Sequence, residues 1–504
     1  MPKPAPSIID AMQSRSLFRQ WFAKPWFSVS TWAAWETFLR CLVALPLSDE
    51  DCARLLKHTG RVMLPTVKQT IGAEKHGGFR EAWVVAGRRA GKSLIASLIA
   101  AYLACFVDFR RYLAPGEVGT IAVIAADRKQ ARTVLRYIKG FLAVPLLRRL
   151  VVNTTQDSIE LSNGVVIEVH TASFRSVRGY TLLAVICDEL AFWRSEESAN
   201  PDTEIIAAVR PGLATIPNSL LLCISSPYAR RGALWNAYDR YFGNNDPNIL
   251  VWQADSKSMN PTVPDSVIQQ AYDEDEASAS AEYGAQFRRD IESFVSREAV
   301  ETCVVRGRLE LPPASDISYR GFCDPSGGSS DSMTLAIAHG FEQKAVLDLV
   351  REVKPPFSPE AVVKEFADLL RRFNITSIEG DRYGGEWCRE PFRQAGINYV
   401  IAERVKSDIY LSALPLLNSC RVELLDNPRL VAQLLGLERR TSRSGKDAVD
   451  HSPHSHDDLV NAACGALLAA EAPQSHLSDG GIFVGAAWPQ EIAMNEFRTW
   501  PKEF

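Results

Sequence analysis

The chain has 504 residues, which is enough for two or three domains. Its 56 Lys and Arg residues against 60 Asp and Glu residues give a net charge of −4. This balance excludes a basic nucleic-acid coat, so any contact with DNA must come from local basic patches. Ten scattered cysteines without a C-x-x-C pair predict a reducing compartment and no structural zinc site. We expect no signal peptide and no membrane span, because the longest apolar run, residues 94–107, is shorter than the about 20 residues a bilayer requires.

Residues 1–80 are predicted to form a helical accessory region. Trp32, Trp35, Phe38 and Leu42 recur at helical spacing, which is typical of a packed helix face. An alternative stays open, in which one of these aromatic rings stacks on an adenine base.

A glycine-bearing loop between an apolar strand and an apolar helix is the central motif of the chain. The predicted strand covers residues 82–85 and the predicted helix covers residues 94–107. In such a loop the backbone N–H groups converge on phosphate oxygens, and the helix N-terminus adds its positive dipole. Lys92 would reach the β- and γ-phosphates, and the Ser93 hydroxyl would complete a Mg²⁺ shell. Ala86 stands where the first glycine is usual, and the expected cradle comprises Gly87, Arg88, Arg89, Ala90, Gly91, Lys92 and Ser93.

Two further apolar runs end in polar residues that suit ATP hydrolysis. Residues 181–187 predict a central parallel strand followed by Asp188, placed to hold Mg²⁺ through water, and Glu189, placed to polarise the attacking water. Residues 220–224 predict another strand, whose following Ser225 and Ser226 would sense hydrolysis. The alternatives are acids that merely meet solvent and a simple Ser-Ser-Pro turn. With predicted strands at residues 120–125 and 165–170, the region forms an α/β unit with a parallel sheet.

The second half of the chain carries acids at the ends of predicted strands and at a helix start. Asp324 follows a strand at 321–323, Asp381 follows a strand at 375–380, and Asp457 precedes an apolar helix at 459–470. Three such carboxylates can converge on two divalent metals, which activate water in phosphodiester cleavage. Each acid also has an ordinary structural interpretation: a turn acid for Asp324, a loop cap for Asp381 and a helix N-cap for Asp457.

Together these motifs resemble those of the large terminase subunit of tailed double-stranded DNA bacteriophages, over roughly residues 30–470. Residues 86–93 resemble the family's divergent Walker A motif, and residues 185–189 resemble its Walker B motif with the catalytic Glu. Ser225-Ser226-Pro227 is similar to its coupling motif, and residues 456–462 resemble the last acidic motif of its nuclease. The implied domains are a helical region at 1–80, a P-loop ATPase domain at 81–255, a linker at 256–315, an RNase H-like nuclease domain at 316–472 and a tail at 473–504.

The resemblance implies an ATP-driven motor that moves double-stranded DNA into an empty capsid and a nuclease that cuts concatemers. The implied cofactors are ATP and Mg²⁺, with Mn²⁺ substituting at the nuclease. The implied partners are DNA, the portal protein, the small terminase subunit and further copies in a ring, a pentamer in similar proteins. The motor would work in the host cytoplasm, docked on the procapsid, and with no membrane partner.

Three points stay open within this interpretation. An arginine finger is either Arg178, acting in a neighbouring subunit, or Arg88, acting within its own. The last metal ligand is either Asp457 or Asp458, with Asp458 favoured. Arg439, Arg440, Arg443 and Lys446 form either a flexible loop that holds DNA phosphates or a solvated surface loop.

Other classes of function also fit parts of the pattern. One is a DNA helicase or remodelling ATPase whose C-terminal acids are structural. A second is an integrase-like strand-transfer enzyme, which no His/Cys cluster supports. A third is a non-enzymatic capsid or portal component, against which Asp188 and Glu189 argue.

Overall fold

The computed structural model describes residues 5–23, 31–61, 78–172, 179–193, 201–329, 331–381, 389–441, 447–452 and 455–471. Arg178, Arg443, Lys446 and the predicted tail at 473–504 lie outside these residues. None of the helices in this described part is both long and apolar enough to cross a bilayer.

The first half of the chain builds an eight-stranded sheet with the order β3-β4-β5-β2-β6-β7-β1-β8. Strands β5, β2, β6, β7, β1 and β8 run parallel, whereas β3 and β4 form an antiparallel edge. The strands are β1 (Glu81–Ala86), β2 (Gly119–Ala125), β3 (Val151–Thr154), β4 (Ser158–Leu161), β5 (Val165–Thr171), β6 (Thr181–Asp188), β7 (Leu220–Ser225) and β8 (Ile249–Ala254).

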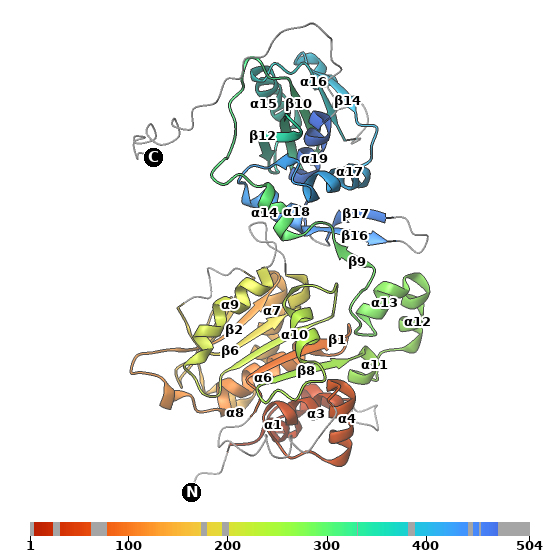
Figure 1. Ribbon diagram of the computed structural model, residues 1–504. Helices are drawn as coiled ribbons and strands as arrows, with labels where there is room; N and C mark the ends of the chain where they lie inside the picture. The colour runs from red at the N-terminus through yellow and green to blue at the C-terminus, as the bar shows by residue number, and fades with distance from the viewer. Residues whose placement is uncertain are drawn as a thin grey trace.

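Helices cover both faces of this sheet, as its near-continuous apolar strands require. One face packs against α6 (Lys92–Phe106) and α7 (Arg128–Leu142), and the other packs against α9 (Pro201–Ala214) and α10 (Gly232–Tyr241). Short elements join the layers: α8 (Pro145–Arg148), η1 (Arg110–Tyr112) and η3 (Leu190–Phe192). The sheet therefore forms the centre of a three-layer α/β unit (Figure 1).

Short N-terminal helices extend the core on the α6 face. Trp35 and Phe38 are buried there in the same apolar cluster as α6, together with Trp252 of β8. These helices are α1 (Ile8–Gln13), α2 (Arg19–Phe22), α3 (Ala33–Leu42) and α4 (Asp49–Thr59). The helical spacing of Trp35, Phe38 and Leu42 is thus a packed face, as the sequence predicted.

The stretch after β8 is more structured than the polar linker that the sequence indicated. It contains four helices and one short strand: α11 (Ser256–Met259), α12 (Asp265–Glu274), α13 (Glu276–Glu282), β9 (Ile291–Ser293) and α14 (Arg297–Cys303). Ser and Asp residues cap three of these helices by accepting backbone N–H bonds, which explains why a polar sequence is helical here.

A six-stranded sheet follows, with the order β14-β13-β10-β11-β12-β15. An antiparallel meander of β10, β11 and β12 is extended by β13 and β14, which run parallel to β10. This order and direction are those of the RNase H-like fold. The strands are β10 (Tyr319–Asp324), β11 (Met333–Phe341), β12 (Lys344–Val353), β13 (Ser377–Gly380), β14 (Asn398–Ile401) and β15 (Val422–Glu423).

Helices pack on both faces of the second sheet too. Helix α15 (Pro359–Arg372) packs in one apolar cluster, while α17 (Lys406–Asn418), α18 (Pro428–Gly436) and α19 (Asp458–Glu471) share another. Helix α16 (Arg389–Gln394) precedes β14. The prediction of an α/β chain with two successive sheets is confirmed.

A small third sheet, β17-β16-β9, lies between the two larger ones (Figure 1). Its strands β16 (Leu437–Thr441) and β17 (Asp447–His451) form a hairpin. Glu438 of β16 is fully buried and accepts hydrogen bonds from Tyr228 Oη (2.7 Å) and from Arg231. Since Tyr228 and Arg231 follow β7 of the first sheet, this carboxylate joins the two halves of the molecule.

Candidate functional site

The loop between β1 and α6 curves tightly at two glycines. Gly91, the residue before α6, has a φ of +94°, a region that side chains with a Cβ rarely adopt. Gly87 is enclosed instead: a Cβ there would lie 2.2 Å from Ser256 Oγ and 2.7 Å from the Tyr283 carbonyl oxygen. Ala86, in contrast, is the buried last residue of β1, so the strand continues one residue further before the loop needs a glycine.

Lys92 lies inside this loop. Its side chain is only 6 % exposed, and its Nζ donates to the carbonyl oxygens of Ala86 (2.9 Å) and Gly87 (3.2 Å) and to Ser226 Oγ (2.7 Å). Nζ also lies 3.3 Å from Glu189 Oε1. The ammonium group therefore sits where the loop, β6 and β7 meet.

Asp188, at the end of β6, lies next to Ser93 at the start of α6. The Ser93 hydroxyl donates to Asp188 Oδ2 at 3.2 Å. Burial, followed by the neighbouring Glu189 charge, raises the pKa of Asp188 to about 7, while Lys92 and Ser93 oppose the shift. A carboxylate so placed gains from an added cation, as a Mg²⁺ ligand does.

Glu189 contacts Ser225 and Ser226 at the end of β7, the strand that lies between β1 and β6. Its Oε2 accepts hydrogen bonds from Ser225 Oγ (3.2 Å) and from the backbone N–H of Ser226 (3.1 Å). Ser226 also binds Lys92, so the two serines contact both the acid and the lysine. The strand order explains this meeting, because β7 is inserted between β1 and β6.

Residues from the linker hold the outer side of the loop. Ser256 Oγ donates to the Arg88 carbonyl oxygen (2.6 Å), and Asn260 Nδ2 donates to that of Arg89 (2.8 Å). The Arg88 guanidinium is 60 % exposed and lies 3.3 Å from Glu282 Oε1. Arg88 is thus ion-paired with the linker in this structure, while the rival finger residue, Arg178, lies outside the described residues.

Two N-terminal tryptophans contact the loop between β1 and α6. Trp35 is buried and its indole N–H donates to the Ala90 carbonyl oxygen at 2.7 Å. The Trp32 ring lies against Gly91, where an added Cβ would be 2.9 Å from it. Burial leaves the Trp35 ring no free face for an adenine base, so of the two tryptophans only Trp32 keeps that alternative open.

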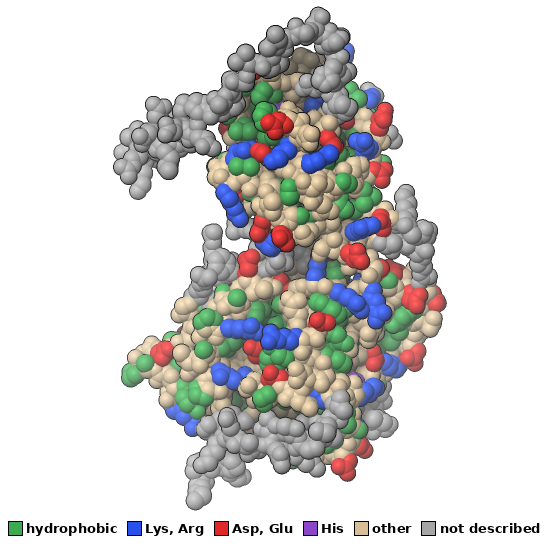
Figure 2. Space-filling model, viewed as in Figure 1, with side chains coloured by type: hydrophobic (Ala, Val, Ile, Leu, Met, Phe, Trp, Pro, Cys, Tyr) green, Lys and Arg blue, Asp and Glu red, His purple; other side chains and the backbone are tan. Residues whose placement is uncertain are grey.

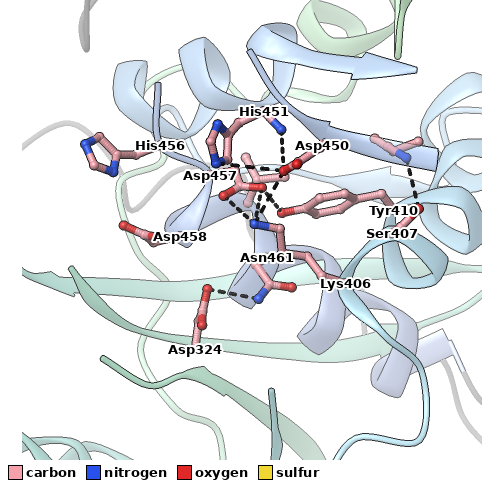
Figure 3. Close-up of polar contacts among 12 residues, drawn as sticks. Asp324, Lys406, Ser407, Tyr410, Asp450, His451, His456, Asp457, Asp458 and Asn461 are labelled. Atoms are coloured by element: carbon pink, nitrogen blue, oxygen red, sulfur yellow. Dashed lines mark hydrogen bonds and ion pairs between the residues drawn. The ribbon is translucent and has the colours of Figure 1, made fainter. Parts of the chain in front are cut away.

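The second site is built around Asn461, which the sequence motifs did not single out (Figure 3). Asn461 is fully buried in α19, and its Nδ2 donates to Asp324 Oδ2 (2.9 Å) and Asp381 Oδ2 (3.2 Å). The amide therefore brings together the acids at the ends of β10 and β13. Its Oδ1 is buried and has no hydrogen-bond partner among the residues that the structure describes. A helical spacing of three residues from Asp458 was the signal that could have identified it.

The two adjacent aspartates at the start of α19 point to different surroundings. Asp457 is buried and accepts hydrogen bonds from Lys406 Nζ (2.9 Å) and Tyr410 Oη (2.8 Å), as Figure 3 shows. Asp458 is partly exposed and accepts from the Ser332 backbone N–H at 3.3 Å. Asp457 thus pairs with a lysine, whereas the donor that contacts the Asp458 carboxylate is a neutral backbone N–H at a longer distance.

The acids of this site favour a cation. Burial is the main cause that raises the pKa of Asp324 to about 8, and the nearby Asp458, Asp381 and Asp457 charges raise it further. Burial and the Asp457 charge raise the pKa of Asp458 to about 6. Across the described part of the chain, however, no three His, Cys, Asp or Glu side chains lie close enough together to hold a metal ion. The oxygen-rich donor set and the buried Asn461 Oδ1, which accepts no hydrogen bond from the described part of the chain, still fit a hard divalent cation.

The basic residues before the last acidic motif are ordered and paired where the structure describes them. Arg439 and Arg440 lie on β16, not in a flexible loop. Arg439 Nε donates to Asp447 Oδ2 (2.9 Å), and Arg440 donates to Glu438 Oε2 (3.2 Å).

Taken together, the chain carries a glycine-bearing loop at the edge of a mainly parallel sheet, followed by a sheet with the strand order of the RNase H-like fold, where Asn461 joins two acids.

Among solved structures, the chain is similar to large terminases of bacteriophages. The HK97 large terminase is 18 % identical with a TM-score of 0.35, covering 81 % of this chain and 95 % of that one. A large terminase from a thermophilic bacteriophage is 11 % identical with a TM-score of 0.36, covering 78 % and 94 %. The large terminase nuclease of the thermophilic phage G20c, in its magnesium-bound form, is 15 % identical with a TM-score of 0.31, covering 35 % and 96 %. No protein-family model and no curated protein matches the chain.

Proposed function

We propose that this chain is the motor subunit of a viral DNA-packaging machine, with an ATPase at residues 81–255 and a metal-dependent endonuclease at residues 316–472. One observation supports the proposal: two groups of polar and acidic side chains occupy corresponding places, the carboxyl ends of central strands, in two sheets of one chain. ATP is the substrate of the first site and double-stranded DNA that of the second.

In the ATPase, the backbone N–H groups of the loop and the Lys92 ammonium bind phosphates. Lys92 Nζ now donates to two backbone carbonyls and Ser226, and phosphate oxygens compete for these same hydrogen bonds. Ser93 and Asp188 would hold the Mg²⁺, which would supply neutralisation of the phosphate charge. Glu189 orients the attacking water and accepts its proton.

The Ser225-Ser226 pair passes the state of the nucleotide to the rest of the chain. Ser226 contacts Lys92, and both serines contact Glu189, so a change at either phosphate-facing group alters the hydrogen bonds of β7. An arginine finger, from Arg178 in trans or Arg88 in cis, completes the charge stabilisation. In the second case Arg88 must first leave Glu282.

In the nuclease, Asp324, Asp381 and Asp458 would hold the divalent cations, Mg²⁺ or Mn²⁺. When bound there, the cations would supply an activated water and charge stabilisation for the leaving oxygen of the phosphodiester. Asn461 orients Asp324 and Asp381, and Asp457 anchors the start of α19 through Lys406 and Tyr410. This assignment gives the two adjacent aspartates different tasks, with Asp458 as the ligand.

The wider role follows from the pairing of a motor with a DNA-cutting site. The chain would act in the host cytoplasm, docked on an empty capsid through the portal protein, with the small terminase subunit delivering DNA. Copies of the chain would form a ring around the duplex, which is the arrangement that an arginine finger in trans requires.

A second candidate is a DNA helicase or remodelling ATPase without nuclease activity. The observation in its favour is that no three potential metal ligands lie at binding distance within the described residues. Cutting of plain duplex DNA that requires Mg²⁺ or Mn²⁺ separates the two candidates.

The test of the packaging role measures ATP hydrolysis with and without purified empty capsids that bear a portal. We expect capsids to stimulate hydrolysis by the wild type, and Lys92→Ala to abolish it in both conditions. Asp324→Ala is the matched control, since it should stop DNA cutting while capsid-stimulated hydrolysis persists. Hydrolysis that is indifferent to portal-bearing capsids would contradict the packaging role while leaving the ATPase assignment intact.

A further inference from the structure

Positive charge accumulates in one segment of the ATPase half. Residues 128–149 contain seven basic and no acidic residues, in a chain whose net charge is −4. On the face of the molecule in Figure 2, by contrast, basic and acidic side chains are interspersed over both lobes. The seven residues are Arg128, Lys129, Arg132, Arg136, Lys139, Arg148 and Arg149.

Helix α7 divides sharply into an apolar and a basic side. Its apolar side chains, including Val134, Ile138 and Phe141, are buried against the sheet in the cluster that also contains Ile121 of β2. The five basic residues of α7 occupy the remaining surface, with Arg128, Arg132 and Arg136 in one i, i+4 row. From residue 128 to residue 139 the helix axis advances about 16 Å.

Three of the seven cations fix the neighbouring turn. Arg132 Nε donates to Asp157 Oδ1 (2.9 Å), and Arg128 lies 3.9 Å from the same carboxylate. Lys139 Nζ donates to the Thr155 carbonyl oxygen at 2.9 Å. These bonds hold the turn between β3 and β4 beside α7, so its exposed polar residues join the same surface.

The other four cations have no such structural task. Lys129, Arg136, Arg148 and Arg149 are exposed, and none forms an ion pair or a side-chain hydrogen bond with the residues that the structure describes. Like charges this close repel one another, so folding stability does not account for their accumulation.

We propose that this basic face, formed by the seven cations and the β3–β4 turn, binds the phosphate backbone of duplex DNA without reading bases. Duplex DNA carries one charge per about 1.7 Å of its axis, so the 16 Å of α7 lies opposite about nine phosphate charges. An anionic membrane fits less well, because the apolar side of α7 is already buried and has nothing to insert. The inference rests on the proposed function in that DNA is a partner.

The face adjoins the nucleotide edge of the sheet. Strand β2 leads directly into α7, and its last residue, Ala125, is paired in register with Asp188. A movement of Asp188 therefore reaches the N-terminal end of the basic helix through one strand pair. This position suits a surface whose binding of DNA is coupled to ATP hydrolysis.

The test uses the full-length chain in EDTA, which prevents metal-dependent cutting during the measurement. Binding of a random-sequence duplex is measured from about 50 to 300 mM salt for the wild type and for the variant Lys129→Ala/Arg136→Ala/Arg148→Ala/Arg149→Ala. Each phosphate contact contributes about 0.9 to the slope of log K against log salt. We expect the slope to fall by up to about 3.6 in this variant. ATP hydrolysis, measured separately with Mg²⁺ and without DNA, should be unchanged.

A matched control removes four exposed cations elsewhere, Arg15→Ala/Arg240→Ala/Lys364→Ala/Arg372→Ala, so that both variants have the same net charge. Equal slopes for the two variants would overturn the inference while leaving DNA binding, and the proposed function, intact. Absence of duplex binding by the wild type would refute the proposed function together with the inference. If the Lys129→Ala/Arg136→Ala/Arg148→Ala/Arg149→Ala variant loses binding to phosphatidylserine vesicles while its DNA slope is unchanged, the inference is also overturned, in favour of a membrane-binding surface.

Discussion

Replacement of Glu438 tests the contact between the two halves of the molecule. Its buried carboxylate accepts hydrogen bonds from Tyr228, Arg231 and Arg440. Removing one partner from a buried ion pair typically costs about 3–5 kcal/mol, because the remaining charge loses its compensation. Here the Arg231 and Arg440 side chains are 29 % and 38 % exposed and can turn towards water, so the lower end applies. We expect Glu438→Leu to destabilise the fold by about 3 kcal/mol.

The measurement is urea unfolding followed by tryptophan fluorescence and by circular dichroism, whose midpoints are compared because the chain has more than one domain. Glu301→Leu serves as the control, since Glu301 pairs with Arg297 at the surface, where 44 % and 46 % of the two side chains are exposed. Exposed pairs contribute about 0–1 kcal/mol. A Glu438→Leu effect no larger than the control effect would refute the reasoning. The double variant Glu438→Leu/Arg231→Met should recover part of the loss, because it removes both members of one pair.

Four further outcomes are expected. Glu189→Gln should bind ATP but lose hydrolysis by about 10²–10⁴-fold in a phosphate-release assay, since an amide cannot accept the water's proton; near-normal turnover would exclude Glu189 as the base. Asp458→Asn should abolish DNA cutting, whereas Asp457→Asn should mainly lower the melting temperature, and the reverse pattern would exchange their tasks. Asn461→Leu should weaken Mn²⁺ binding in calorimetry while ATP hydrolysis persists; unchanged affinity would deny it a positioning role. Burial lowers the pKa of His58 below 6.5, so protonation of this side chain favours the unfolded chain. The contribution of neutral His58 to the free energy of unfolding should be complete above about pH 6.5 and decline below it. His58→Gln should flatten that decline when urea titrations are repeated over this pH range.

The geometry of the proposed ATPase site was largely predictable because its sequence signals are local. The strand before the loop and the helix after it were expected at 82–85 and 94–107, and they occur at Glu81–Ala86 and Lys92–Phe106. A buried parallel strand is a continuous apolar run, and a helix that begins at a glycine loop is contiguous in sequence. Lys92, Glu189 and Ser226 lie close together because β7 is the strand between β1 and β6.

The features that could not be predicted depend on partners far along the chain. Arg439 and Arg440 looked like loop residues, yet they lie on a strand, where Arg439 bonds to Asp447 and Arg440 to Glu438. The different surroundings of Asp457 and Asp458 depend on Lys406, about fifty residues earlier in the chain. Strand β12 also went unpredicted, because its second half, Leu-Val-Arg-Glu-Val, mixes charges into the apolar pattern. The roles assigned to the individual site residues stay predictions.

Glu189 has a left-handed backbone, with a φ of +50° and a ψ of +46°. This conformation costs a residue with a side chain about 1–2 kcal/mol, and glycine would adopt it freely. Glycine would also lose the hydrogen bonds from Ser225 and Ser226 and remove the carboxylate beside the buried Lys92 ammonium. Loss of one partner from a buried ion pair costs about 3–5 kcal/mol, which exceeds the strain that glycine relieves. Random variants selected for heat resistance alone should therefore keep Glu189, because the contacts that position the carboxylate also stabilise its strained backbone.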